Sequence, residues 1–148
     1  MRILGSRGTL YHFTDEEGAA SILDTNYMFG TKNGKDQYYG VSMTRNPRFV
    51  VRQDASVRLT FAGGKINSNY KIEPVYHEGY RDQDEEVVLA RRLENVDRYL
   101  IAVDFLYDDE EDNMEFLQKY VTEFNTKHST KVLFNGGKAE FTKNRGKI

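Results

Sequence analysis

Residues 9–13 alternate weakly between apolar and polar side chains and are rich in β-favouring types, which predicts a short strand. Immediately after it, apolar side chains recur on one helical face, at Ala19, Ala20, Ile22 and Leu23. Thr14 and Glu17 have the spacing of a capping box, in which a hydroxyl caps the helix and an acid reaches back. We therefore expect a helix of about 10 residues from Asp15, with Thr14 as its N-cap.

The same patterns predict further strands and one more helix. Strand character returns at residues 38–44, 57–61, 100–105 and 131–134. A second helix is expected over residues 113–125, because apolar side chains fall at helical spacing at Met114, Leu117, Tyr120, Val121 and Phe124. Glycine and polar clusters predict a loop at residues 30–40, a turn at Gly63-Gly64, and a surface loop at residues 77–85.

Two helices and about six short strands, mostly not alternating one for one, predict an α+β fold rather than a doubly wound sheet. The chain contains no internal repeat and no Pro- or Ser-rich linker. Its 148 residues match the usual size of one domain, so we expect residues 1–148 to form a single domain.

Composition narrows the classes of function. A formal net charge of −2 argues against a dedicated nucleic-acid binder, which needs a basic surplus to neutralise phosphates. The absence of cysteine excludes disulfides, thiolate nucleophiles and zinc–thiolate sites. No apolar run approaches the roughly 20 residues of a membrane span, and the first residues lack the apolar core of a signal peptide. These features favour a cytoplasmic protein.

A metal site or a phosphate loop is not expected. The three histidines, His12, His77 and His128, lie far apart in sequence, without the short spacing of metal-binding pairs. The acidic run at residues 108–112 lacks the Gly and terminal Glu of an EF-hand loop, so it is interpreted as a solvated linker. The glycine pairs do not precede a Lys-Ser/Thr sequence, which a phosphate loop requires.

His12 is the first candidate for chemistry. It lies on a strand that leads into a capped helix start, where free N–H groups and the helix dipole favour a polar or anionic ligand. An imidazole there can bond a ribose hydroxyl or a phosphate. Taken alone, a histidine on a strand is more often structural.

Two further segments carry polar side chains on predicted strands. Ser42 and Thr44 are two residues apart, so both hydroxyls point to one face of the strand. Gln83 and Glu85 are also two apart, at the entry to an apolar strand, where a carboxylate can stabilise a cation or accept a ribose hydroxyl. The alternatives are a strand with one wet face and a charged loop. Near these segments lies a cluster of four arginines, for which phosphates, a nucleic-acid target and solvent are the alternative partners: Arg45, Arg48, Arg52 and Arg58.

In this order the three segments resemble the ADP-ribosyltransferase fold family, especially small members from bacterial and bacteriophage genomes. The resemblance rests on His12 within Tyr-His-Phe-Thr, on the Tyr-Gly-Val-Ser-Met-Thr strand at residues 39–44, and on Glu85 within Gln-Asp-Glu. It covers roughly residues 9–105 of the chain. It implies two small, mostly antiparallel sheets around a cleft, with flanking helices.

The resemblance also implies a chemistry with NAD as co-substrate. Its implied NAD-binding residues are His12, Phe13, Thr14, Tyr39, Ser42, Thr44 and Arg45. His12 would bond a ribose hydroxyl and the backbone of Phe13 the nicotinamide amide, while Tyr27, Tyr38 or Tyr39 would stack on the nicotinamide ring. The implied catalytic residues are Glu85, which stabilises the positive charge as nicotinamide leaves, and Gln83, which orients the acceptor.

Glu86 is the alternative acid, because a one-residue change of register moves it onto the other face of the strand. The leading hypothesis is an NAD-dependent ADP-ribosyltransferase with a macromolecular acceptor, a protein before a nucleic acid. A non-catalytic binding or structural protein on the same fold, as in bacteriophages, is the second. A different small enzyme or a nucleic-acid-associated protein, including the fold-related RNA 2′-phosphotransferases, is the third.

Overall fold

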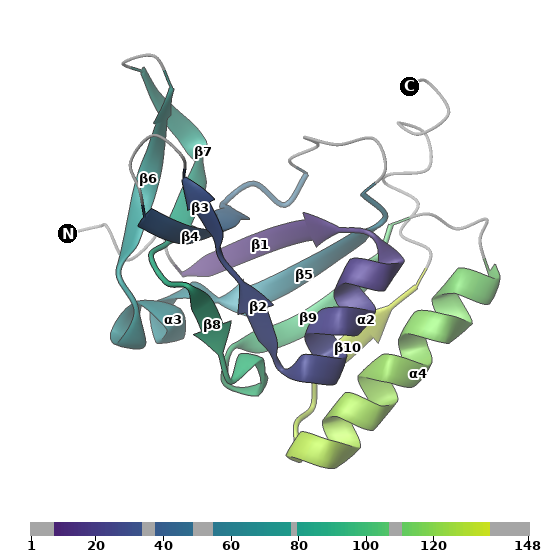
Figure 1. The fold of residues 1–148 in the computed structure, drawn as a ribbon. Helices are drawn as coiled ribbons and strands as arrows, with labels where there is room; N and C mark the ends of the chain where they lie inside the picture. The colour runs from purple at the N-terminus through teal and green to yellow at the C-terminus, as the bar shows by residue number, and fades with distance from the viewer. Residues whose placement is uncertain (1–7, 34–37, 49–54, 78–79, 107–110, 137–148) are drawn as a thin grey trace, which may run out of the picture.

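The computed structural model describes residues 8–33, 38–48, 55–77, 80–106 and 111–136. These residues form ten strands, three α-helices and one 3-10 helix (Figure 1). In chain order they are β1 (Thr9–Thr14), α2 (Glu16–Thr25), β2 (Tyr27–Phe29), β3 (Thr31–Asn33), β4 (Tyr38–Thr44), β5 (Val57–Ala62), α3 (Gly63–Asn69), β6 (Ile72–His77), β7 (Tyr80–Val88), β8 (Arg92–Glu94), η1 (Val96–Arg98), β9 (Leu100–Phe105), α4 (Glu111–His128) and β10 (Leu133–Asn135).

The strands form one large and one small sheet. The large sheet has the order β10-β9-β5-β1-β4-β7-β6, with β3 added to β4, and β2 pairs with β8 in the small sheet. Neighbouring strands run antiparallel except β9 and β10, which are parallel and are connected through α4. In Figure 1 the small sheet lies in front of the large one, and α2 and α4 lie side by side at one end. The predicted α+β class with mostly antiparallel sheets is confirmed, with sheets of unequal size.

The core lies on one face of the large sheet. Leu10 is opposite Phe61, and Leu59 is opposite Val103, and all four side chains are fully buried. They belong to one apolar cluster with side chains from α2 and α4, including Leu23, Leu117, Val121 and Phe124. Burying each large apolar side chain contributes about 1.5–3 kcal/mol, so this cluster fixes the sheet against the helix pair.

The predicted first helix is confirmed, but its N-cap is Asp15 and not Thr14. The Asp15 carboxylate accepts a hydrogen bond from the Gly18 amide at 2.7 Å. Thr14 is instead the last residue of β1, and its carbonyl accepts a hydrogen bond from the Ser56 amide. The strand therefore runs one residue further than its sequence pattern predicts, and the cap moves with it.

The strands over residues 38–44, 57–61 and 100–105 are confirmed, and the second helix is longer than predicted. Three predictions of loops are wrong. Thr31–Asn33 is a strand because it pairs with β4, and Gly63 begins α3 instead of making a turn. Residues 77–85, predicted as a surface loop, belong largely to the hairpin of β6 and β7. Backbone pairing forms these strands although their sequence shows no apolar alternation. The basic tail from Lys138 lies outside the described residues.

Among the described helices, none is both long and apolar enough to cross a membrane.

Candidate functional site

The large sheet splits between β1 and β4. Strand β1 pairs with β5 at six positions, but with β4 only at Tyr11 and Thr44. Beyond that pair, the His12 side chain takes the place of a backbone partner, with Nδ1 2.8 Å from the Ser42 carbonyl oxygen. Because a carbonyl oxygen only accepts, Nδ1 carries a proton and donates it to the Ser42 carbonyl. The split thus holds a histidine whose ring is oriented by the backbone of β4.

Strand register separates the two candidate acids. Thr44 is opposite both Tyr11 and Glu85, so these three side chains share one face of the sheet. Glu86 is opposite Met43 and therefore points to the other face. His12 is opposite the fully buried Leu59, which places His12 on the same face as Glu86. His12 therefore shares a face of the sheet with Glu86, and Glu85 lies on the other face.

Glu86 is fully buried and forms an ion pair with Arg45. Arg45 Nε lies 3.0 Å from Glu86 Oε2, and the side-chain exposure is 25% for Arg45 and 0% for Glu86. The contact does not have the direction of a hydrogen bond. A charge removed from water needs a partner, because desolvation without one costs several kcal/mol. Arg45 is therefore the charged partner that this buried carboxylate needs.

Arg45 also has a hydrogen-bond donor without an acceptor among the described residues. This donor is Nη2, which is buried. Buried donors in native structures are nearly always paired, and one left unpaired costs about 1–3 kcal/mol. An acceptor oxygen brought by a ligand would remove this cost, so the donor set fits a ligand rich in oxygen atoms.

The turn after β4 fixes the position of Arg45. The Thr44 hydroxyl accepts a hydrogen bond from the Asn46 amide at 3.1 Å, and the Asn46 side-chain oxygen accepts one from the Arg48 amide at 2.9 Å. The Pro47 carbonyl accepts a third from Arg58 Nη1 at 2.7 Å. These three bonds hold the turn on both sides of Arg45 and Asn46.

Arg58 is part of a buried polar network on the opposite face of the sheet. Its Nε and Nη2 lie 3.1 and 2.8 Å from one Asp104 carboxylate oxygen, and the Asn135 amide donates to the other oxygen at 2.7 Å. Its guanidinium carbon lies 5.7 Å from the centre of the Tyr11 ring. Arg58 therefore joins β5 to the turn that carries Arg45, a role that sequence could not indicate because the partners lie far apart. Arg52, from the same predicted cluster, lies outside the described residues.

The end of β1 is tied to α2 and β5. The Ser56 hydroxyl donates a hydrogen bond to the Glu16 carboxylate, and Phe13 packs partly buried against the core. A Cβ atom at Gly18 would lie too close to the Thr14 hydroxyl, so a larger residue there requires the Thr14 side chain to move. Phe13 and Thr14 thus lie next to His12 on a fixed segment.

A cavity of about 620 Å³ lies beside the small sheet, lined by Phe29, Gly30, Tyr39, Arg91, Arg92 and Glu94. The Arg91 guanidinium carbon lies 4.6 Å from the centre of the Tyr39 ring, and that of Arg92 lies 4.7 Å from the centre of the Tyr27 ring. A hydrogen bond to Glu94, at 2.8 Å, raises the pKa of Arg92 above its usual value. Tyr39 thus contacts a cavity that the sequence analysis did not predict.

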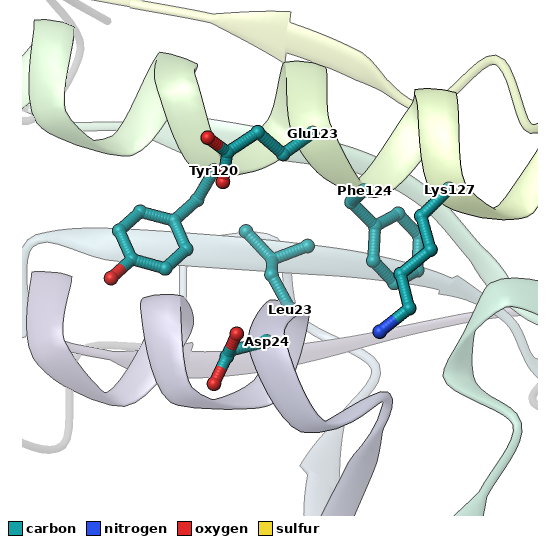
Figure 2. Close-up of a pocket in the computed structure, with 6 residues that line it drawn as sticks. All are labelled: Leu23, Asp24, Tyr120, Glu123, Phe124 and Lys127. Carbon is teal, nitrogen blue, oxygen red and sulfur yellow. The ribbon is translucent and has the colours of Figure 1, made fainter.

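A smaller cavity lies between α2 and α4 (Figure 2), lined by Leu23, Asp24, Tyr120, Glu123, Phe124 and Lys127. Its volume is only about 80 Å³. Pockets for small molecules measure roughly 300–1,000 Å³, so this one does not hold such a ligand.

The predicted site residues therefore do not all lie on one face of the sheet. His12, Arg45 and Glu86 share one face at the split, and Ser42 contributes its carbonyl to His12. Thr44 and Glu85 lie on the other face. The backbone of Gln83 lies in β7, and its side chain lies outside what the structure describes.

This arrangement of sheets and helices is the α+β fold of the ADP-ribosyltransferases. A similar solved structure is that of Thermus sp. 2.9 DarT in complex with carba-NAD+. The two align with a TM-score of 0.62 over 92% of this chain and 98% of that one, at 8% sequence identity. No family model matches the sequence, and no curated protein is similar to it.

Proposed function

We propose that the protein is an NAD-dependent ADP-ribosyltransferase that modifies a macromolecule and releases nicotinamide. The observation that carries this proposal is the buried ion pair of Arg45 and Glu86 on the face of the sheet that also carries His12. The fold supports it, because the similar DarT structure contains an NAD+ analogue.

Glu86 is the proposed catalytic carboxylate. NAD supplies the ADP-ribosyl group, and its nicotinamide is the leaving group. Loss of nicotinamide puts positive charge on the ribose, and a fixed carboxylate in a water-poor site stabilises such charge more strongly than one in water. Glu86 has this environment, whereas Glu85 is half-buried beside Thr44 on the other face. We therefore assign the acid to Glu86 and not to Glu85.

Arg45 and His12 bind and orient in this proposal. Arg45 Nε stays with Glu86, and Nη2 donates to an oxygen of the bound dinucleotide. His12, with Nδ1 bound to the Ser42 carbonyl, accepts a ribose hydroxyl through Nε2. The backbone of Phe13 binds the nicotinamide amide, and Thr14 borders the same site. Gln83 keeps the role of orienting the acceptor.

The acceptor in this proposal is a macromolecule, and the chain's net charge of −2 favours a protein. One observation supports the second candidate function, a binding protein without transferase activity: Glu86 has no exposed surface, so a substrate reaches it only if neighbouring groups move.

The test compares matched variants in the same strand. Wild type, Glu86→Gln, Glu85→Gln and His12→Ala are incubated with NAD labelled in the adenylate and with a cell extract. The proposal predicts labelled macromolecules with wild type and Glu85→Gln, and a loss of about 100-fold or more with Glu86→Gln. NAD binding, measured by calorimetry, should persist in Glu86→Gln and weaken in His12→Ala.

Binding of NAD by every variant with no transfer by any of them would favour the binding-protein function. Neither binding nor transfer by wild type would refute both. Loss of transfer in Glu85→Gln alone would instead identify Glu85 as the catalytic carboxylate.

A further inference from the structure

The split between β1 and β4 is bridged by a side chain on each face of the large sheet. On the face of Glu86, the His12 ring bonds to the Ser42 carbonyl at 2.8 Å. On the other face, Arg58 of β5 donates through Nη1 to the Pro47 carbonyl at 2.7 Å. Because β1 lies between β5 and β4 in the sheet, Arg58 crosses a whole strand to reach the turn after β4. No step of the proposed transfer uses this arginine.

The Arg58 guanidinium is held on several sides. Its Nε and Nη2 lie 3.1 and 2.8 Å from one Asp104 oxygen, and the Asn135 amide holds the other oxygen at 2.7 Å. The Tyr11 ring of the crossed strand lies 5.7 Å from the guanidinium carbon. A guanidinium is planar and its donors have fixed directions, so fixing two of its nitrogens also fixes the direction of the third. The position of the Pro47 carbonyl is therefore set by a rigid group in the sheet.

The bond from Arg58 attaches the turn to another strand. The other two hydrogen bonds of the turn join the Thr44 hydroxyl to the Asn46 amide, and the Asn46 side chain to the Arg48 amide. Each joins residues two apart, so these bonds shape the turn without attaching it to another strand. The bond between Arg58 and Pro47 joins residues eleven apart.

The position of the turn determines the position of Arg45, which lies two residues before Pro47. Arg45 Nε lies 3.0 Å from Glu86 Oε2, and its side chain is 25% exposed, so water competes for it. A long side chain also regains rotamer freedom when it leaves such a contact. Since ion pairs and hydrogen bonds weaken steeply once the groups separate, a displaced turn would separate Arg45 from Glu86.

We infer that Arg58 is a positioning residue for the proposed active site. By holding the Pro47 carbonyl it keeps Arg45 Nε beside Glu86 and directs Arg45 Nη2 toward the oxygen of the ligand. Arg58 does not touch the substrate, because it acts from the opposite face of the sheet. The part of this inference that concerns NAD rests on the proposed function, whereas the part that concerns the Arg45–Glu86 pair does not.

Two variants of the network remove the bond to Pro47. Arg58→Lys keeps a positive charge beside Asp104 but has one nitrogen in place of three, so it loses the forked contact. The double variant Arg58→Met, Asp104→Leu removes both charges, leaves neither one buried alone, and should therefore fold. Asn135→Ala is the matched control, because it removes a hydrogen bond to Asp104 in the same network without touching the turn. Thermal denaturation verifies that each variant is folded at the assay temperature.

The first measurement is the coupling energy between Arg45 and Glu86. It is obtained by chemical denaturation of Glu86→Leu, Arg45→Met and their combination, made in each background. The coupling energy should fall to less than half of its wild-type value in both backgrounds that lack Arg58, and should be unchanged in Asn135→Ala. A merely structural role of Arg58 would lower the stability of the fold without changing this coupling.

The second measurement is the kinetics with NAD. In Arg58→Lys the KM for NAD should rise about 10-fold while kcat changes less than about threefold, because Glu86 stays on β7 and only the donor of Arg45 is displaced. An unchanged coupling energy, an unchanged KM, or equal effects in Asn135→Ala would overturn the inference. If wild type neither binds nor consumes NAD, the proposed function fails, and the coupling energy alone decides whether Arg58 positions Arg45.

Discussion

Replacing Glu86 by Gln removes one charge from a buried ion pair and leaves the side-chain size almost unchanged. Breaking such a pair by removing one partner costs about 3–5 kcal/mol, because the remaining charge stays buried. Arg45 keeps 25% of its side chain exposed, so water compensates part of this cost, and we expect a loss of about 2–3 kcal/mol. For a chain of this length, that lowers the melting temperature by about 4–12 °C.

The assay is chemical denaturation of Glu86→Gln, together with a double-mutant cycle made of Glu86→Leu, Arg45→Met and the double variant. Replacing both charges by apolar groups removes the unpaired charge, so the double variant should be more stable than the sum of the single losses predicts, by about 2 kcal/mol. An unchanged denaturant slope would show that the native fold is retained. Glu85→Gln, on the half-exposed face, should cost less than about 1 kcal/mol. A coupling energy near zero between Arg45 and Glu86 would refute the reasoning.

Three other substitutions test the segments around the site. Asp104→Ala leaves Arg58 buried without its carboxylate, and should cost about 3–5 kcal/mol in urea denaturation; a loss below about 1 kcal/mol contradicts the network. Gly18→Ala should lower the melting temperature because the new methyl collides with the Thr14 hydroxyl, although helix propensity alone predicts a gain of about 1 kcal/mol. Asn26→Ala should cost about 1–2 kcal/mol, measured in the same way, because it loses a left-handed helix cap and two hydrogen bonds to η1; an unchanged midpoint rejects this.

Elements with a clear apolar period were predictable from sequence. The first strand and helix, the strand over residues 38–44 and the strand over residues 100–105 follow their patterns, because each buries one face against the core. The hairpin of β6 and β7 was missed because backbone pairing, and not apolar alternation, defines its polar half. Gly63-Gly64 was predicted to be a turn. This was wrong because a glycine pair alone does not indicate that a helix, here α3, begins at that point.

The residues of the candidate site could be named from the sequence, but not the face of the sheet on which each of them lies. The order of motifs brings His12 and an acid of β7 into one sheet, but only the pairing of β4 with β7 distinguishes Glu85 from Glu86. Arg45 was among the predicted binding residues. Its ion pair with Glu86 was not predicted, because it forms only when β4 pairs with β7. The cavity at Phe29 and Arg91 was missed because its residues come from three strands with no shared motif, and the adjacent Arg91 and Arg92 were the only indication in the sequence.

The most direct test of the central claim is the rate at which nicotinamide is released from NAD by Glu86→Gln and by Glu85→Gln, each relative to wild type. The account predicts a decrease of about 100-fold or more for Glu86→Gln and a change of less than about threefold for Glu85→Gln. Equal rates for wild type and Glu86→Gln, or a selective loss in Glu85→Gln, would contradict the assignment of the buried carboxylate as the catalytic acid.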